Sequence, residues 1–317
     1  MIEKNLASSV GIIGRSYSDP GNERVKFCTD LITDISTLNK RNKSFLKEFN
    51  DGISRVTGRF IIRDGLIARD IPNLEARIPL DGEFDDFSLV YLGINSFTRM
   101  EDKFLIAAEV SMAKSIDDNI KTISYNNAIK RIKDKGFSVV SGNVLKDIDP
   151  NNIIELYNEA YKGSYTFDLT HENVTNLLNN PNNIKAVVVN SDGKVVSIGV
   201  AEVSKCSLSG RDFRFAELSD AATYDSYKRM GLYTATSSAL MQRLAEEDID
   251  LIYGEARACH KGVNLVCRRS GRNFYGLLNK HCKISGEKDI NEFGPYENLN
   301  VWAVTGSKLK KIMEMDN

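Results

Sequence analysis

The stretch from Ala216 to Tyr233 constrains the fold most, because it combines a strand, a tight loop and the start of a helix. Apolar residues over 215–223 predict the strand, and helical periodicity begins at Leu232. The loop between them places free backbone N–H groups and Gly231 at the positive end of that helix, which suits a bound diphosphate. The same residues also fit an ordinary strand-to-helix turn, and taken alone they favour that turn.

The order of elements around this stretch is legible from Gly136 onward. The segment Asn190-Ser191-Asp192-Gly193 predicts a hairpin turn between two apolar strands. Asp149 is suited to cap the helix that begins at Pro150. The predicted strands are 137–144, 184–189, 195–203, 215–223, 251–256, 274–278 and 300–304, and the predicted helices are 150–161, 171–178, 232–244 and 261–270.

The preceding residues are harder to interpret. Apolar residues at helical spacing predict a helix within 23–49, short strands are expected over 59–68 around Arg63-Asp64-Gly65, and another strand over 87–94. A helical stretch follows over 102–135, with an interruption near 115–118 and an end at Gly136. We therefore expect an N-terminal α+β domain at 1–100, a helical connector at 101–135 and a C-terminal domain at 136–317. The pair Gly11 and Gly14 is interpreted as a turn, because it lacks a full nucleotide-binding glycine pattern.

Composition excludes several classes of protein. The 317 residues carry a net charge of −1 and no basic block, so nucleic acid is not an expected partner. No segment reaches the ~18 apolar residues of a membrane span. The five cysteines are scattered without a CxxC pair, and the three histidines lie far apart, so no metal is expected. A soluble protein of the reducing cytoplasm fits this composition.

The loop resembles motif A of the GCN5-related N-acetyltransferase (GNAT) superfamily, whose pattern is Gln/Arg-x-x-Gly-x-Gly/Ala. It aligns as Lys228-Arg229-Met230-Gly231-Leu232-Tyr233, which keeps the central glycine. Lys228 replaces Gln or Arg at the first position, and Tyr233 replaces a small residue at the last. Tyr233 could narrow a diphosphate pocket or pack outward.

A longer resemblance is to beta-lysine N-acetyltransferases. The segment Ala216-Glu217-Leu218-Ser219-Asp220-Ala221-Ala222-Thr223 is similar to their strand before the loop. Order and spacing agree over 136–304, apart from an apparent insertion at 288–296, whereas the first hundred residues show no such resemblance. Further similar segments are 256–258, 262–264, 270–271, 284–286 and 297–302.

This resemblance implies a mixed, mainly antiparallel sheet that splays at 215–223 to hold acetyl-CoA or another acyl-CoA as co-substrate. Backbone N–H groups near 221–223 would stabilise the oxyanion. The residues expected to hold the donor are Ala222, Thr223, Lys228, Arg229, Met230, Gly231, Leu232, Tyr233 and Asn264.

Glu217 and Asp220 are the candidate catalytic residues, because an amine must lose a proton before it attacks a thioester. Glu217 is the expected base, and Asp220 would bind the acceptor's ammonium group or share the role. Three residues apart, they would face opposite ways in a regular strand, but the bulge usual in GNAT strands would bring both to the cleft. Their structural alternative is a carboxylate that caps the loop or pairs with Arg214 or Arg257.

The proton donor to the leaving thiolate stays open. The family often has a tyrosine where this chain has Cys267, which is either a core residue or a donor. Tyr233, Tyr253 and Tyr275 are alternatives, and a thiol that titrates at ~8.5 can leave without an acid.

The expected reaction is acyl transfer to a primary amine of a small amino acid or diamino metabolite. Arg257, Asn279 and His281 are expected to contact that acceptor, with a solvent-facing position as the alternative for Asn279, Lys280 and His281. Two other functions stay open: a non-catalytic CoA-binding or scaffolding module, and an acyltransferase that uses a carrier-protein thioester. A homodimer is also left open.

Overall fold

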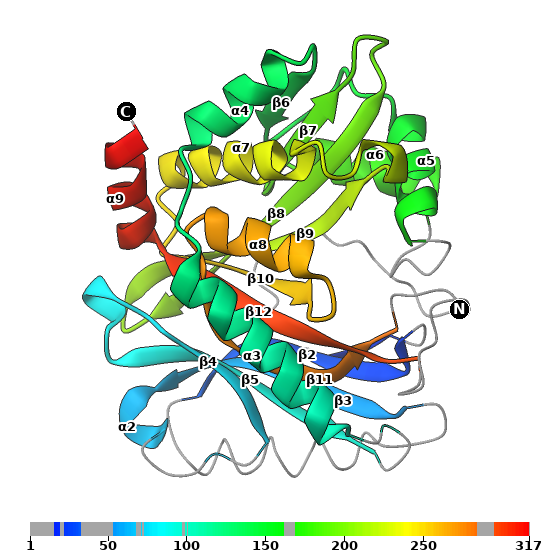
Figure 1. Cartoon of the computed structure of the whole chain (residues 1–317). Coiled ribbons are helices and arrows are strands. Elements are labelled where there is room, and N and C mark those ends of the chain that lie inside the picture. The colour runs from blue at the N-terminus through cyan, green and yellow to red at the C-terminus, as the bar shows by residue number, and fades with distance from the viewer. Residues whose placement is uncertain are drawn as a thin grey trace.

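The computed structural model describes residues 16–19, 22–32, 53–67, 71, 73–96, 99, 101–161, 169–283 and 295–316. Their strands form one twelve-stranded sheet, which runs through the middle of the molecule (Figure 1). The strands are β1 (Ser16–Asp19), β2 (Arg24–Ile32), β3 (Arg55–Arg63), β4 (Leu74–Pro79), β5 (Phe87–Asn95), β6 (Ser138–Gly142), β7 (Asn183–Val189), β8 (Val195–Leu208), β9 (Arg211–Thr223), β10 (Leu251–Arg257), β11 (Asn273–Cys282) and β12 (Glu297–Thr305).

The strand order is β1-β2-β3-β5-β4-β11-β12-β10-β9-β8-β7-β6. Within the described residues, β2 with β3 and β9 with β10 are the parallel pairs, and the other pairs are antiparallel. This arrangement confirms the predicted class, a mixed and mainly antiparallel sheet flanked by helices.

The helices cover both faces of the C-terminal part of the sheet. A Cβ atom added to Gly199 of β8 would contact side chains of α7. The neighbouring Ile198 and Val200, which point to the other face of the sheet, pack with Leu156 of α5. In Figure 1, α3, α7 and α8 all lie in front of the sheet. The helices are α2 (Asp64–Ile67), α3 (Lys103–Asn119), α4 (Tyr125–Lys133), α5 (Pro150–Tyr161), α6 (His171–Asn179), α7 (Leu232–Glu246), α8 (Lys261–Arg269) and α9 (Gly306–Asp316), with short 3₁₀ turns η2 (Gly82–Phe84) and η3 (Asp225–Tyr227).

Most elements predicted after Gly136 are confirmed to within a few residues. Asp149 caps α5 by accepting a hydrogen bond from the N–H of Asn151, at 2.9 Å. The strands β8 and β9 are longer than predicted, because they continue to a two-residue turn at Ser209 and Gly210. Both turn residues have positive φ, 54° and 79°, as tight hairpins require.

The N-terminal predictions were partly wrong. Residues 24–32 form β2 instead of the start of a helix, since Val25 and Phe27 alternate into a core with Val56. Residues 33–49 lie outside the described part of the chain, as do Gly11, Gly14 and most of the insertion at 288–296.

Two element boundaries also differ from prediction. Instead of short strands over 59–68, one continuous strand, β3, ends at Arg63 and is followed directly by the single helical turn α2, which begins at Asp64. The break between α3 and α4 falls at 120–124, later than expected, because Ser124 caps α4 through a hydrogen bond from the N–H of Asn127.

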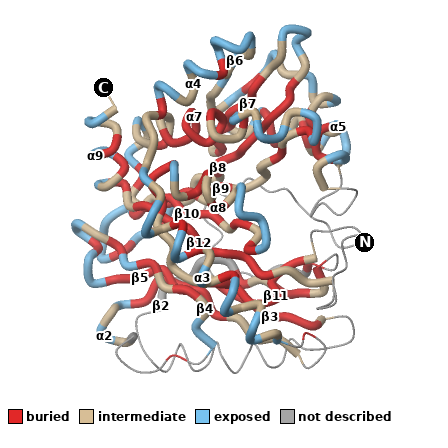
Figure 2. The backbone as a smooth tube through the Cα atoms, viewed as in Figure 1, coloured by how far each residue is buried: buried red, intermediate tan, exposed pale blue. Residues whose placement is uncertain are grey.

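The N-terminal strands extend the same sheet and curve back over one face of β9 and β10. The register pairs β4 with β11 only at Ala76 and Gly276, where added side-chain bulk on the glycine would overlap the β4 backbone. A shared core fills the curve, with Tyr91 of β5 against Tyr253 of β10. Figure 2 shows that most of the backbone of the central strands is buried. The domain boundaries at 100 and 135 stay a prediction.

Candidate active site

The strands β9 and β10 separate part-way along their length. Residues 215–218 pair with 251–254, and the pairing ends at Leu218 and Gly254, although β9 continues to Thr223. From 219 onward β9 has no β10 partner on that side. The opening lies at the strand where the sequence predicted a splay, and an extended ligand could pair with the free edge.

A β-bulge shapes the open part of β9. Gly199 of β8 stands opposite both Asp220 and Ala221, and Asp220 has a φ of 49°. Two hydroxyls of α5 hold the bulge, because Tyr157 donates to the Asp220 carbonyl at 2.9 Å and Tyr161 donates to the Ala221 carbonyl at 2.8 Å. The bulge expected from the resemblance is therefore present, and it is anchored by a neighbouring helix.

A third carboxylate joins the two predicted ones. Glu202 of β8 is the register partner of Glu217, and directly opposed residues project to the same face of a sheet. Ser219 Oγ donates to Glu202 Oε1 at 2.9 Å. Sequence reasoning missed Glu202, although the turn at 209–210, once recognised, sets the register that brings Glu202 opposite Glu217.

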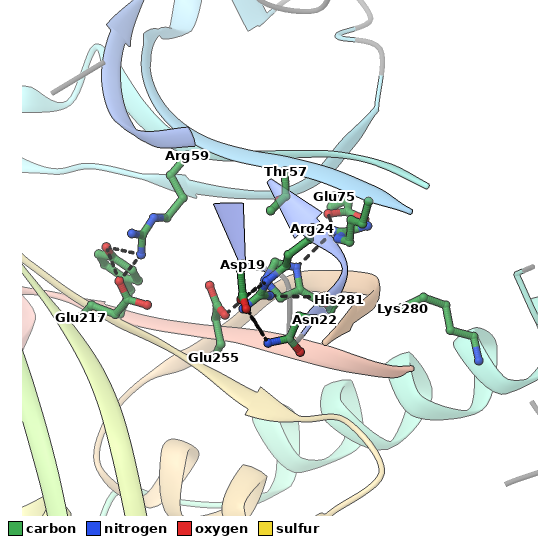
Figure 3. Close-up of polar contacts among 12 residues, drawn as sticks. Asp19, Asn22, Arg24, Thr57, Arg59, Glu75, Glu217, Glu255, Lys280 and His281 are labelled. Carbon is green, nitrogen blue, oxygen red and sulfur yellow. Dashed lines mark hydrogen bonds and ion pairs between the residues drawn. The ribbon is translucent and has the colours of Figure 1, made fainter. Parts of the chain in front are cut away.

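Glu217 already has a cationic partner from the N-terminal strands. Figure 3 shows Arg59 of β3 directed at Glu217, and the two side chains form an ion pair. Arg59 also donates to the Tyr253 hydroxyl at 2.9 Å. Burial favours the neutral acid, but the positive charges of Arg59 and Lys26 outweigh it and lower the pKa of Glu217. Glu217 is thus held as a carboxylate, which makes it a weaker base.

Glu202 has the opposite electrostatic environment. Burial, and then the negative charges of Asp220 and Glu217, raise the pKa of Glu202 to about 7. A carboxylate with a pKa near the working pH is the better general base. The pair therefore separates into a permanently charged member, Glu217, and a titrating member, Glu202.

The loop before α7 has the geometry of an anion site. Arg229 and Gly231 have φ values of 65° and 91°, and Gly231 is the residue that caps α7. The N–H groups in the first turn of a helix have no acceptor within it, so they are available to an anion. Lys228 forms an exposed ion pair with Asp225, and Lys135 donates to the Met230 carbonyl at 3.1 Å. Both ammonium groups thus stay beside the loop.

Four other residues that were predicted to hold the donor have side chains that pack in the protein or form hydrogen bonds within it. Leu232 and Ala222 are buried in the core with α5, and Thr223 shares a hydrogen bond with Ser197 at 2.8 Å. Asn264 is fully buried, donating to the carbonyls of Arg257 and His260 while its own carbonyl accepts from Trp302. Asn264 therefore fixes the start of α8 against β10 and β12.

Tyr233 lies at the helix side of the opening. It lies beside Arg272 and Cys267, and burial raises its pKa to about 12 against the opposing charge of Arg272. Cys267 packs in a core with Trp302 and is 2% exposed. Tyr253 lies on the other face with Arg59. Of the three alternative tyrosines, Tyr233 is thus the one beside Cys267.

The predicted acceptor residues lie in two places: Arg257 is near enough to Tyr161, which holds the bulge, for its charge to act on that hydroxyl, whereas Asn279 and His281 lie in a buried cluster around Arg55. Arg257 forms a two-pronged ion pair with Glu297. His281 is 1% exposed, with Nδ1 at 3.2 Å from Arg55 Nη2 and Nε2 at 3.7 Å from Glu255 Oε2. Burial and the surrounding arginines hold the pKa of His281 well below its usual range.

Asn279 belongs to the same buried polar cluster, since its carbonyl accepts from Arg55 at 2.7 Å. Asn279 and Lys280 are 8% and 2% exposed. The solvent-facing alternative for Asn279, Lys280 and His281 is therefore wrong.

Among the residues that the structure describes, no cluster of three His, Cys, Asp or Glu side chains has a metal-binding arrangement. Over the same residues, every helix is too short or too polar to cross a bilayer.

The sequence is similar to two curated acetyltransferases. It is 28% identical over 123 residues to N-acetyltransferase YodP of Bacillus subtilis (strain 168), covering 39% of each protein. It is 21% identical over 190 residues to the beta-lysine N(6)-acetyltransferase of Methanococcus maripaludis, covering 60% of this chain and 62% of that enzyme. The matches thus span less than two thirds of either relative's length. No family model matches the chain.

Solved structures of acetyltransferases resemble about half of the chain. The ribosomal-protein-alanine N-acetyltransferase of Brucella melitensis is 18% identical with a TM-score of 0.42, covering 53% of this chain and 98% of that one. Arabidopsis thaliana NAA60 in complex with acetyl-CoA is 8% identical with a TM-score of 0.43 and the same coverage. The similarity to known proteins therefore rests on the two sequence relatives, which are both N-acetyltransferases. The splayed, bulged strand before a glycine-capped helix is the arrangement that the resemblance to GNAT enzymes implied.

Proposed function

We propose that this protein is an acyl-CoA-dependent N-acyltransferase that transfers an acyl group, most simply acetyl, to a primary amine of a small amino acid or diamine. The observation that carries the proposal is the separation of β9 and β10, because the opening connects the Gly231 loop on one side with the carboxyl groups of Glu202 and Glu217 on the other. The sequence similarity to two N-acetyltransferases supports the same reaction.

The donor would enter from the helix side. Its diphosphate would bind the N–H groups around Gly231, and its pantetheine arm would run along the free edge of β9 toward Leu218. That edge is about 17 Å long from Thr223 to Leu218, at ~3.3 Å per residue. The thioester would then lie near the point where the two strands separate.

The acceptor would approach from the opposite face, where Glu202, Glu217 and Arg59 lie. Glu217 and Leu218 are consecutive in β9, so their side chains project to opposite faces of the sheet. The acids on one face can therefore reach a donor bound on the other face only through the opening between β9 and β10. The carboxylates suit an ammonium group, and Arg59, whose side chain is 15% exposed, suits a carboxylate. This combination favours an acceptor that carries both groups, as amino acids do.

The chemical steps follow from these positions. Glu202 takes a proton from the acceptor's ammonium group, and the freed nitrogen lone pair forms a bond to the thioester carbon. Backbone N–H groups of the bulge would stabilise the oxyanion. When the intermediate collapses, the nitrogen loses its second proton to solvent, the C–S electron pair moves to sulfur, and CoA leaves as the thiolate. Glu202 then releases its proton to solvent.

Two measurements on the purified full chain test this proposal. Calorimetric titration with acetyl-CoA should show binding, and a thiol-release assay should show turnover with amino acids or diamines. Binding without turnover on any amine would instead favour the non-catalytic CoA-binding module. Turnover only with an acyl carrier protein would favour a carrier-bound donor.

A further inference from the structure

Arg272 is a buried cation without a counter-ion. It lies in the turn between α8 and β11, is 2% exposed, and forms no ion pair with any carboxylate of the described residues. Its Nε donates to Ser270 Oγ at 3.0 Å, whereas its Nη2 is buried without a hydrogen-bond partner. Burying an uncompensated charge is costly, so such an arrangement needs a reason.

The position of Arg272 supplies that reason. A Cβ added to Gly254 would lie 3.1 Å from Arg272 Nη1 and 2.9 Å from the Leu218 carbonyl oxygen. Gly254 and Leu218 form the last register pair before β9 and β10 separate. The guanidinium therefore lies at the apex of the opening, on the face covered by α7 and α8.

The neighbours of Arg272 are neutral groups. Its charge acts on the hydroxyls of Tyr233 and Tyr125 and on the thiol of Cys267. By the resemblance to GNAT enzymes, Cys267 stands where those enzymes often have a tyrosine that serves the leaving thiolate. The chain thus lacks that tyrosine but has a cation and the Tyr233 hydroxyl beside the same place.

We propose that Arg272 is a catalytic residue that stabilises the CoA thiolate as the C–S bond breaks. This inference rests on the proposed function, which brings the thioester to the apex. The sulfur is neutral in the bound thioester and gains negative charge during the reaction. An unpaired guanidinium therefore interacts more strongly with the transition state than with the substrate, which is the requirement for catalysis. The electron pair of the C–S bond stays on sulfur, and the thiolate takes a proton from solvent after release.

The test is the ultraviolet absorbance of the thiolate in the complex with free CoA, titrated against pH. The desulfo-CoA complex serves as the blank for the protein's own thiols. Among the cysteines whose side chains the structure describes, burial raises the pKa of Cys206 and Cys259 to about 11 and of Cys282 to about 12, and also raises that of Cys267, so they ionise above the expected range. The blank also subtracts any signal from Cys28. We expect the bound CoA thiol to titrate at least about one pH unit below a free thiol, whose pKa is ~8.5.

Three variants assign the effect. Arg272→Met should abolish the shift and lower kcat more than it changes the Kd for desulfo-CoA. Arg272→Lys should keep most of the shift, and Tyr233→Phe, which keeps the charge, should do the same. An unshifted thiol in the wild-type complex, or an equal shift in Arg272→Met, would overturn the proposal. If the wild-type protein binds CoA but the thiol is not shifted, only the role of Arg272 fails. If the wild type binds neither CoA nor desulfo-CoA, the proposed function fails as well. Both outcomes are read from the wild type, so they do not depend on whether a variant folds.

Discussion

The two faces of the β9–β10 opening are built in different ways. The proposed donor face consists of the backbone loop at Gly231, the start of α7 and the free edge of β9, which are contiguous in sequence, with the Arg272 side chain at its far end. The acceptor face is made of charged side chains from three separate strands, Arg59 of β3, Glu202 of β8 and Glu217 of β9. In the proposed function, the diphosphate is thus bound by the main chain of one contiguous stretch, whereas the acceptor chemistry depends on side-chain pairs between strands that are distant in sequence.

The largest expected effect breaks the donor face alone. Gly231→Glu places a carboxylate against the donor's phosphates and forces a side chain into a φ of 91°. Since juxtaposed like charges cost several kcal/mol, affinity for acetyl-CoA should fall at least about a hundredfold. Calorimetry measures this loss.

Gly210→Glu is the matched control, because its φ is 79° and it lies at the far turn of the β8–β9 hairpin. It introduces the same charge and similar strain, so it should bind acetyl-CoA like the wild type. Equal affinity in the two variants would refute the loop as the diphosphate site.

Glu202→Gln should break the acceptor face while leaving the donor face intact. Loss of a general base lowers kcat by about 10²- to 10⁴-fold, with acetyl-CoA affinity retained. The base acts when deprotonated, so the wild-type rate should rise with pH through about 7, where Glu202 titrates. Steady-state rates across pH should show this limb in the wild type and not in Glu202→Gln.

Glu217→Gln distinguishes the two acids. Removing its negative charge should lower the pKa of Glu202, because burial, Asp220 and Glu217 together raise it. The rising limb of the pH–rate profile should therefore move to lower pH, with a smaller loss of kcat than in Glu202→Gln. If Glu217→Gln removes the limb and Glu202→Gln keeps it, Glu217 is the base.

The link between the N-terminal strands and the acids can be measured as a coupling energy. Arg59→Gln removes the ion-pair partner of the Glu217 carboxylate and should destabilise the fold by about 2 kcal/mol. The double variant Arg59→Gln/Glu217→Gln should lose less than the sum of the single variants, with a coupling of about 1 kcal/mol. Urea unfolding of the four proteins completes the cycle, and additive losses would show that the pair is not coupled.

Tyr161→Phe should give the smallest effect. It removes one hydrogen bond to the bulge at Ala221, so stability should fall by about 1 kcal/mol. Tyr157→Phe removes the equivalent bond to Asp220 and is the natural comparison. If neither variant changes kcat, the hydroxyls serve folding and do not position the bulge for catalysis.

The same contrast explains how much could be predicted from the sequence. The loop at Gly231 and the order of elements after Gly136 were predictable, because a strand, a turn and a helix leave periodic signals in contiguous residues. Glu217 and Asp220 were found through the resemblance. The prediction of a helix within 23–49 was wrong for residues 24–32. The helical spacing of their apolar residues could not reveal that they form a strand paired with β3.

The acceptor face could not be predicted in the same way. Nothing near Arg59 indicates that it contacts Glu217, because their pairing follows from the curvature of a sheet whose strands are distant in sequence. Glu202 was missed because the hairpin turn at 209–210 was not recognised, and with it the register was lost. His281 and Asn279 were expected at the acceptor but lie among buried arginines, a position that only tertiary packing decides.

A crystal structure of the full chain with CoA would show directly where the donor binds. We expect the diphosphate at the N–H groups of the Gly231 loop and the sulfur at the apex between Leu218 and Gly254, with Glu202 across the opening. A diphosphate bound elsewhere, or a sulfur remote from both Arg272 and Glu202, would contradict this expectation.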